Sequence, residues 1–295
     1  MKILCSYCNT ESGLYFRSRD YNRKITQEVF KHYRCPQCGL IFIAPIPKNL
    51  GDYYPQSYYA VSDSTKILEE GEVHERYKIE IIQRYARKGR LLEIGPSQGC
   101  FAYFAKKSGF ETEAIEMDAR CSEFLNKVAG IPTVNSSDTC GALKSLKPFD
   151  VIALWHVIEH LPNPLELLEI ISEKLNPGGI LILAAPNPDA FQFHILGRFW
   201  PHVDAPRHLM LIPEQILVSK MASLGMKVKL ITTTDEGGLR WNIFGWEYFF
   251  ANLSASSEIN RKLRTIGRMV GKLLSPIEKI EGKGSAYTMV FRKES

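Results

Sequence analysis

The sequence contains no apolar run that approaches the ~20 residues needed to span a bilayer, so no transmembrane helix is expected. Its first residues hold neither a long apolar stretch nor a cleavage site, so no signal peptide is expected and the predicted location is cytoplasmic. Charge of one sign is not in large excess, because 37 Lys and Arg face 32 Asp and Glu, a formal net charge of +5. That surplus alone does not indicate nucleic-acid binding. The 295 residues, 45% of them hydrophobic, suit one large domain with appendages.

The surplus of positive charge is concentrated in two segments. Residues 1–45 contain seven Lys and Arg against three Asp and Glu, and residues 258–274 contain five against one. Basic segments of this kind suit an anionic substrate, a membrane surface or RNA, and they also occur as plain solvated faces. The charge pattern therefore leaves all of these partners open.

Disulfides are not expected in a cytosolic chain, so the seven cysteines favour a metal site or free thiols. Four thiolates in two Cys-x-x-Cys pairs match the tetrahedral preference of Zn²⁺ and leave no open position for catalysis. A module of about 45 residues builds little core, and a metal supplies the missing folding energy. We therefore predict a structural zinc ribbon over residues 1–45, with strands between 14 and 33. Its predicted zinc ligands are Cys5, Cys8, Cys35 and Cys38.

Residues 46–72 have the prolines and polar residues of a linker. This segment also contains four tyrosines, which either line a substrate cleft or pack between the ribbon and the rest of the chain. They are Tyr53, Tyr54, Tyr58 and Tyr59.

From about residue 73, helix and strand patterns alternate, which predicts an α/β domain over residues 73–295. Apolar runs such as 180–183 indicate strands buried on both faces of a largely parallel sheet. The predicted strands are 90–95, 111–117, 132–135, 149–155, 179–185, 227–233 and 286–292. The predicted helices are 74–88, 99–108, 119–129, 164–175 and one that starts after Pro213 and ends near Gly225.

The strand at 90–95 runs into a glycine turn that lacks the third glycine of a dinucleotide fingerprint. The turn reads Glu-x-Gly-x-x-x-Gly, with Glu93, Gly95 and Gly99. A carboxylate beside the turn would repel a pyrophosphate, and it suits a cofactor that carries an ammonium and a sulfonium, as S-adenosylmethionine does. Glu116, at the end of the next strand, is placed to accept from both ribose hydroxyls. The alternative is a strand–turn–helix unit with incidental acids.

A third segment, 149–164, is a strand followed by a polar and aromatic loop and then a helix. The motifs of the chain now resemble the class I S-adenosylmethionine-dependent methyltransferases. They are Leu-Glu-Ile-Gly-x-x-x-Gly at 92–99, Glu116, Phe-Asp-Val-Ile at 149–152 and Glu-His-Leu-Pro-Asn-Pro at 159–164. The segment 200–209, Trp-Pro-His-Val-Asp-Ala-Pro-Arg-His-Leu, is similar to a bacterial subgroup with an N-terminal Cys-x-x-Cys zinc ribbon. Several members of that subgroup are associated with sugar or polysaccharide pathways.

The resemblance implies a Rossmann-like sheet of seven strands with the last strand antiparallel. It implies that Glu93 and Gly95 lie near the methionine part of S-adenosylmethionine, that Glu116 holds the ribose, and that the adenine lies near residues 136–138. The predicted cofactor-binding residues are thus Glu93, Gly95, Gly99, Glu116, Ser137, Asp138, Trp155 and His156.

Methyl transfer to a hydroxyl or an acidic carbon needs a base, because the acceptor must lose a proton. Histidine is the natural candidate, and the predicted catalytic residues are His160, then His208 and His156, with His202 last. The alternative for each is a hydrogen-bonded structural histidine. The adjacent Glu159 and His160 could help hold a divalent metal, but the sequence shows no obvious further ligand cluster.

About 50 residues, 234–284, separate the last two predicted strands, which form a hairpin in the plain methyltransferase fold. The first part of this insertion is rich in aromatic residues, and the second is predicted to be a cationic amphipathic helix. The insertion either packs on the domain, forms an acceptor lid or a dimer contact, or makes peripheral membrane contact through 240–277.

The sequence thus predicts a methyltransferase that acts on a small molecule, through a hydroxyl of a sugar, a polysaccharide precursor or a related metabolite. One alternative is an RNA methyltransferase that grips phosphates with the ribbon and the basic segments. Against it, the loop after the strand at 149–155 reads Leu-Trp-His, not the Asn/Asp-Pro-Pro-aromatic type that methylates exocyclic base nitrogens. The other alternative is a non-catalytic cofactor-binding module. The acceptor atom and the oligomeric state are not predicted.

Overall fold

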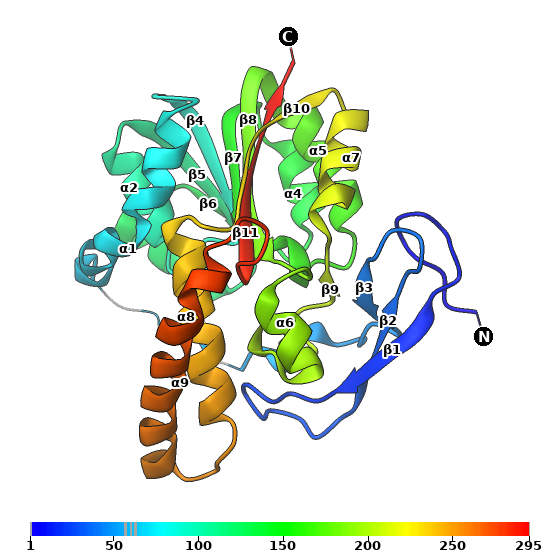
Figure 1. Ribbon diagram of the computed structural model, residues 1–295. Coiled ribbons are helices and arrows are strands. Elements are labelled where there is room, and N and C mark those ends of the chain that lie inside the picture. Colours follow the sequence, from blue (N-terminus) through cyan, green and yellow to red (C-terminus); the bar gives the residue numbers. More distant parts are fainter. Residues whose placement is uncertain (1, 56–57, 60, 62–63, 295) are drawn as a thin grey trace.

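A mixed seven-stranded sheet lies at the centre of the computed structural model, which describes residues 2–55, 58, 59, 61 and 64–294 (Figure 1). The strand order is β10-β11-β8-β7-β4-β5-β6. β11 runs antiparallel to β8 and β10, and the other neighbours are parallel, so the predicted topology is confirmed. The strands are β4 (Gly89–Ile94), β5 (Phe110–Glu116), β6 (Thr133–Asn135), β7 (Phe149–Trp155), β8 (Leu175–Pro186), β10 (Met226–Thr232) and β11 (Ala286–Lys293).

Helices cover both faces of this sheet, as the uniformly apolar strands require. Leu91 packs against Phe101 in the cluster under α1 and α2, whereas its neighbour Leu92 packs in the cluster under α4, α5 and α7. Successive side chains of a strand point to opposite faces, so a strand buried on both sides needs no alternation. The helices are α1 (Lys66–Gln83), α2 (Cys100–Lys107), α3 (Ala119–Phe124), α4 (Thr139–Ser145), α5 (Pro164–Lys174) and α7 (Glu214–Ser223).

Two predicted boundaries are wrong. The helix predicted at 74–88 is α1, which begins at Lys66 and ends at Gln83. Gly71 interrupts the helical pattern there because a side chain at this position would come within 3.0 Å of the Cys100 sulfur on α2. β8 begins at Leu175 rather than at 179, since residues 176–179 form an irregularity in its pairing with β7.

The N-terminal ribbon is a four-stranded sheet with the order β1-β2-β3-β9. β1 (Gly13–Ser18), β2 (Phe30–Arg34) and β3 (Ile41–Ile43) come from the ribbon itself, so the strands expected between residues 14 and 33 are present. β9 (Met210–Leu211) was not predicted and comes from the loop that follows β8. The ribbon is therefore built into the rest of the molecule by a shared sheet.

Residues 234–284 form a helical hairpin of α8 (Glu236–Ala251) and α9 (Ser257–Glu278). The aromatic part of the insertion is thus also helical. In Figure 1 this hairpin, α6 (Phe191–Leu196) and the blue ribbon gather at one end of the sheet, below the point where β8 finishes. Among the described residues no helix is long and apolar enough to cross a membrane.

That end of the sheet is its carboxyl edge, where α/β proteins bind ligands. From β4 the chain proceeds outward to β5 and β6, and then returns to β7 on the other side of β4. The loops after β4 and β7 therefore diverge at a topological switch point. This places the predicted glycine turn beside the loop after β7, which contains His156 and His160.

Candidate active site at the carboxyl edge of the sheet

The turn after β4 has a backbone that favours glycine. Gly95 and Gly99 have φ angles of +69° and +82°, in the left-handed region. A Cβ at Gly95 would lie 2.7 Å from a methyl group of Val157, and one at Gly99 would lie 2.2 Å from a methyl group of Leu125. Both glycines are therefore required by backbone conformation and by close packing. The turn leads directly into α2, with Gly99 as its N-cap residue.

Glu116, the last residue of β5, is hydrogen-bonded to this turn. Its Oε2 accepts from the Ser97 amide at 2.9 Å and its Oε1 accepts from the Asp118 amide at 2.8 Å. Burial raises the pKa of Glu116, and these two amides oppose the rise. Each carboxylate oxygen has a second lone pair, so the acid can also accept from a ligand hydroxyl.

Glu93 lies buried beneath the turn, and its Oε2 has no hydrogen-bond partner in the part of the chain that the structure describes. Burial raises the pKa of Glu93 to about 8, against the opposing charge of Lys78. A cation near this oxygen would lower the pKa again and supply the missing partner. The orphaned acceptor therefore fits a cofactor with a cationic end, such as S-adenosylmethionine.

The predicted adenine contacts, Ser137 and Asp138, are exposed beyond β6 at the same edge. Asp138 caps α4 by accepting from the Gly141 amide at 2.9 Å. The backbone nearby is held to Glu116, whose carbonyl accepts from the Ser136 amide at 3.1 Å. Contact of Ser137 and Asp138 with an adenine stays a prediction.

Trp155 and His156 end β7 beside the glycine turn. The indole of Trp155 is buried against Phe101, and no described residue accepts a hydrogen bond from its N–H. His156 has a φ of +56°, an unusual conformation for a non-glycine residue that is often found at functional sites. Its ring is 20% exposed and lies 4.6 Å from the ring of Trp241 on α8. The insertion therefore contributes a wall to this site.

Glu159 is at the centre of the histidine loop, with 1% of its side chain exposed. Neither carboxylate oxygen has a hydrogen-bond partner among the described residues. Oε1 lies 3.7 Å from His156 Nδ1 and 3.9 Å from His208 Nε2. Burial by itself would raise the pKa of Glu159, but the neighbouring histidines, including His160, hold it down at about 2. The histidines thus oppose the effect of burial on this acid.

Three of the four predicted histidines converge on this carboxylate. His160 Nδ1 lies 2.9 Å from the Tyr54 hydroxyl and 3.0 Å from the Arg207 carbonyl oxygen, and burial lowers the pKa of His160 to about 4. The rings of His160 and His208 are 4.6 Å apart. The fourth, His202, is buried beside Trp241, and burial lowers its pKa to about 3.

The sequence shows no obvious further ligand beside Glu159 and His160, but the structure brings His208 to them. One ligand atom from each of Glu159, His160 and His208 lies within 4.8 Å of the others. His208 comes from the loop that precedes β9, 48 residues beyond His160 in the chain. No local spacing could have revealed the cluster, because the chain returns to the site only through the tertiary fold. Tyr54, from the predicted linker, also joins the site in this way.

The ribbon holds the loop that carries His208. The Arg207 guanidinium is fully buried and pairs with Asp20 of the ribbon at 2.6 Å and with Asp204 at 2.8 Å. Asn22, also in the ribbon, donates to the Pro201 carbonyl at 2.6 Å. These contacts connect the ribbon to the loop of residues 200–208.

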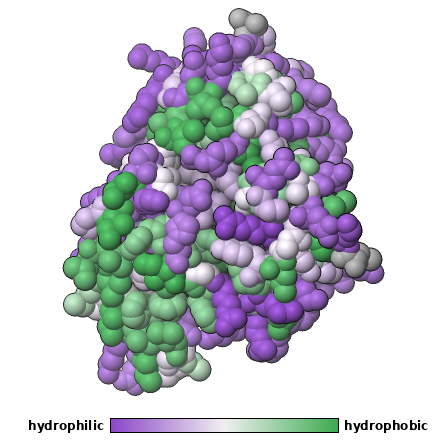
Figure 2. Space-filling model, turned by 45° about the vertical axis from the view of Figure 1, so that its right-hand side comes forward, coloured by the Kyte–Doolittle hydropathy of each residue, from purple (hydrophilic) through white to green (hydrophobic). Residues whose placement is uncertain are grey.

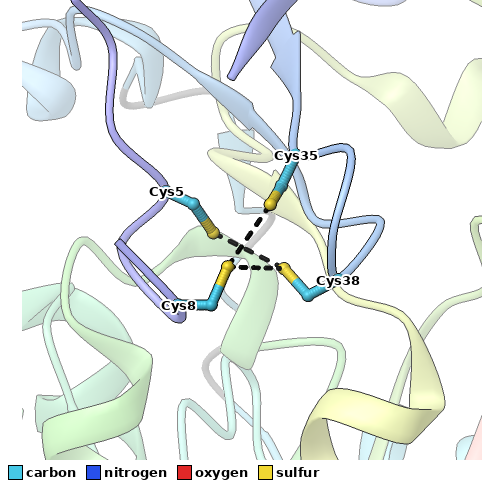
Figure 3. Close-up of side chains that lie close together, drawn as sticks. All are labelled: Cys5, Cys8, Cys35 and Cys38. Atoms are coloured by element: carbon cyan, nitrogen blue, oxygen red, sulfur yellow. Dashed lines mark hydrogen bonds between the residues drawn. The ribbon is translucent and has the colours of Figure 1, made fainter. Parts of the chain in front are cut away.

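The four ribbon cysteines point toward a common centre (Figure 3). The sulfur atoms of Cys5 and Cys38 are 3.5 Å apart, those of Cys8 and Cys35 are 3.4 Å apart, and those of Cys8 and Cys38 are 3.7 Å apart. Tetrahedral Zn–S bonds of ~2.3 Å place sulfurs roughly 3.8 Å apart. The donor set and its spacing fit zinc with little movement.

Comparison with known proteins places this geometry in context. The family model described as a methyltransferase domain matches residues 71–229. A ubiquinone biosynthesis O-methyltransferase of Cereibacter sphaeroides is 26% identical over 165 residues, which cover 54% of this chain. The match spans 66% of that relative, just under two thirds of its length.

Solved structures share the fold. A SAM-dependent methyltransferase from Archaeoglobus fulgidus superposes with a TM-score of 0.51 at 20% identity, covering 77% of this chain and 94% of that chain. A phosphoethanolamine N-methyltransferase of Haemonchus contortus, solved with S-adenosylhomocysteine, gives a TM-score of 0.52 at 14% identity. That match covers 100% of this chain and 71% of the other.

Proposed function

The chain belongs to the methyltransferase domain family, and on that basis we propose that it transfers the methyl group of S-adenosylmethionine to a small-molecule hydroxyl. One observation carries the proposal. The glycine turn after β4 lies beside the loop after β7 at the switch point of the sheet. Glu116 accepts a hydrogen bond from this turn, and Glu93 lies beneath it with an Oε2 that has no partner among the described residues.

We expect different residues to bind the cofactor and to act on the acceptor. We expect Glu116 to hold the ribose and Glu93 to face the cationic end, while Gly95, Gly99, Trp155 and His156 shape the walls. S-adenosylmethionine supplies an activated methyl group when bound. The chain must then position the acceptor and remove its proton. The side chain of His156 is 20% exposed, against 12% for His208, and His156 is the first candidate for that proton.

An oxygen acceptor is supported by the name of the relative, an O-methyltransferase. The hydroxyl of a sugar or polysaccharide precursor is the narrower proposal. Trp241 offers an apolar ring surface beside His156, against which the carbon face of such a ring could pack. An RNA acceptor would instead show steep loss of binding with salt.

Calorimetric titration with S-adenosylmethionine tests the cofactor assignment through Glu116→Ala. Hydrogen bonds to a charged group contribute about 1.5–3 kcal/mol each, so losing both ribose contacts should weaken binding roughly 100-fold or more. Glu111→Ala, an exposed acid at the other end of β5, should bind like the wild type. Equal affinity in Glu116→Ala would contradict the proposal. Binding without methyl transfer to any acceptor would indicate a non-catalytic module.

We also propose that the four ribbon cysteines hold a structural zinc ion. Four protein ligands complete the tetrahedron, so this ion has no position for a substrate. Its proposed role is to stabilise the folded ribbon, whose Asp20 pairs with Arg207.

The outer face of α9 supports a second proposal, contact with an anionic membrane surface. Met269 and Leu273 are 66% and 78% exposed. They belong to a row of exposed apolar side chains that covers the hairpin at the lower left of Figure 2. The row consists of Ile259, Ile266, Met269, Leu273, Ile277 and Ile280. Exposed cations flank it, namely Arg261, Lys262, Arg264, Arg268 and Lys272.

The inner face of α9 is already occupied by α8, so the outer row is a second apolar face. Gly267 allows the close approach, because a Cβ there would lie 2.5 Å from the Trp246 carbonyl. A helix with an apolar face bordered by Lys and Arg lies in the interface of anionic lipids.

Co-sedimentation with vesicles tests this contact. The wild type should bind phosphatidylglycerol vesicles and not phosphatidylcholine vesicles, with binding weakened by salt. A Met269→Glu, Leu273→Glu double variant should lose roughly 10-fold or more in affinity, since burial of each side chain contributes about 1.5–3 kcal/mol. Val73→Glu with Ile195→Glu places the same charges on other exposed apolar positions and serves as the control. Equal loss in both variants would contradict the proposal.

A further inference from the structure

Glu159 is a buried carboxylate whose charge the described protein atoms do not satisfy. Its side chain is 1% exposed, and neither oxygen accepts a hydrogen bond from any residue that the structure describes. A buried carboxyl group without hydrogen-bond partners is costly unless it is paired or coordinates a metal. The imidazole nitrogens of His156 and His208 lie 3.7 and 3.9 Å from Oε1, beyond hydrogen-bonding distance.

Hydrogen bonds fix how two of the imidazoles are protonated. His160 Nδ1 lies 3.0 Å from the Arg207 carbonyl oxygen, and His208 Nδ1 lies 2.7 Å from the His202 carbonyl oxygen. A carbonyl oxygen only accepts, so both Nδ1 atoms carry the proton. The Nε2 atoms are then left with free lone pairs. Metal-binding histidines are oriented in this way, with one ring nitrogen donating to a backbone carbonyl and the other facing the ion.

We propose that Glu159, His160 and His208 form a binding site for a divalent first-row transition-metal ion. Their ligand atoms lie within 4.8 Å of one another, and small side-chain rotations would bring them to the roughly 3.0–3.4 Å that metal–ligand bonds of ~2.1 Å impose. Two imidazoles and one carboxylate are the donor set of open iron, manganese or zinc sites. Unlike the closed cysteine site, three protein ligands leave coordination positions free.

The free positions suit an oxygen of the acceptor, and this part of the inference rests on the proposed function. An acceptor hydroxyl on the ion would lose its proton more readily, since a divalent cation favours the oxyanion. Metal binding would also give two of the three histidines around Glu159 another role. His160 and His208 would be ligands, and His156, with Nδ1 at 3.7 Å from Glu159, would be the histidine left to take the proton.

Manganese titration followed by electron paramagnetic resonance tests the site, because binding removes the signal of the free ion. Mn²⁺ prefers oxygen and nitrogen donors to thiolates, so the full-length protein can keep its ribbon metal throughout. One ion should bind per chain, without cofactor or acceptor. Glu159→Gln, which keeps the shape of the side chain, and His208→Asn should each weaken binding roughly 100-fold or more.

Glu93→Gln is the matched control, since Glu93 is also a buried acid with an unpartnered oxygen but has no imidazole as a described partner. It should bind Mn²⁺ like the wild type. If the wild type binds no ion, or if Glu159→Gln binds as tightly as Glu93→Gln, the metal site is refuted. Neither outcome depends on S-adenosylmethionine, so failure of the metal site and failure of the methyltransferase assignment can be told apart.

Discussion

Replacing Arg207 with methionine should lower the free energy of unfolding by about 3–5 kcal/mol, the cost of breaking a buried ion pair from one side. The guanidinium has no exposed surface and makes hydrogen-bonded pairs with Asp20 and Asp204. Methionine fills a similar volume but leaves both carboxylates without their cation. The loss should also free the ribbon from the loop of residues 200–208, because Asp20 is a ribbon residue.

Urea titrations at neutral pH measure this loss, with Arg268→Met as the matched control. Arg268 also pairs with a carboxylate, Glu247, but is 57% exposed. Exposed pairs contribute about 0–1 kcal/mol, so the control should unfold almost like the wild type. Hydrogen exchange should rise at the ribbon amides in Arg207→Met only. A similar stability in the two variants would contradict the role assigned to the buried pair.

The difference should also depend on pH with a defined sign. Burial would raise the pKa of Asp204, but the hydrogen bond from Arg207 holds it at about 2, below the ordinary 3.8. An acid with a lowered folded-state pKa stabilises the protein above its unfolded pKa and loses that contribution as the pH falls toward the folded value. The stability gap between the wild type and Arg207→Met should therefore be full at neutral pH and shrink between about pH 4 and pH 2.

The sequence predicted best what depends on local pattern. The strands around 90–95 and 149–155 were recognisable because a buried parallel strand is a short, continuous apolar run bounded by turn residues. The glycine turn was recognisable because its backbone requires a specific residue type at Gly95 and Gly99. The cysteine pairs were recognisable because one tight turn presents two sulfurs. Each of these signals lies within about ten residues of chain.

What the sequence could not predict depends on segments that meet only in three dimensions. Glu159 and His160 are adjacent, but His208 reaches them through a loop held by Arg207 and Asp20. The predicted linker contributes Tyr54 to the same site for a similar reason. Nothing in the residues near His208 marks it as a partner of Glu159, because the pairing is determined by tertiary packing. The sequence therefore offered Glu159 and His160 as two possible metal ligands but did not identify His208 as the third.

Removing the ribbon metal should abolish methyl transfer while leaving cofactor binding largely intact. Structural zinc contributes about 10–16 kcal/mol in zinc-finger peptides, more than a small module gains from its own core. Cys8→Ser should therefore unfold the ribbon and release its zinc. Asp20 and Asn22 then no longer hold the 200–208 loop, so His208 should leave its place beside Glu159.

The turn after β4 and Glu116 make their described hydrogen bonds within the α/β domain, so affinity for S-adenosylmethionine should change by only a few fold. Metal analysis, calorimetry and a methyl-transfer assay on the same preparation separate the two effects. Cys140→Ser, a partly exposed thiol on α4, is the control and should keep zinc, cofactor binding and activity. Full activity of zinc-free Cys8→Ser would contradict the role given to the ribbon. A parallel loss of cofactor binding would show that the ribbon supports the whole α/β domain and not the 200–208 loop in particular.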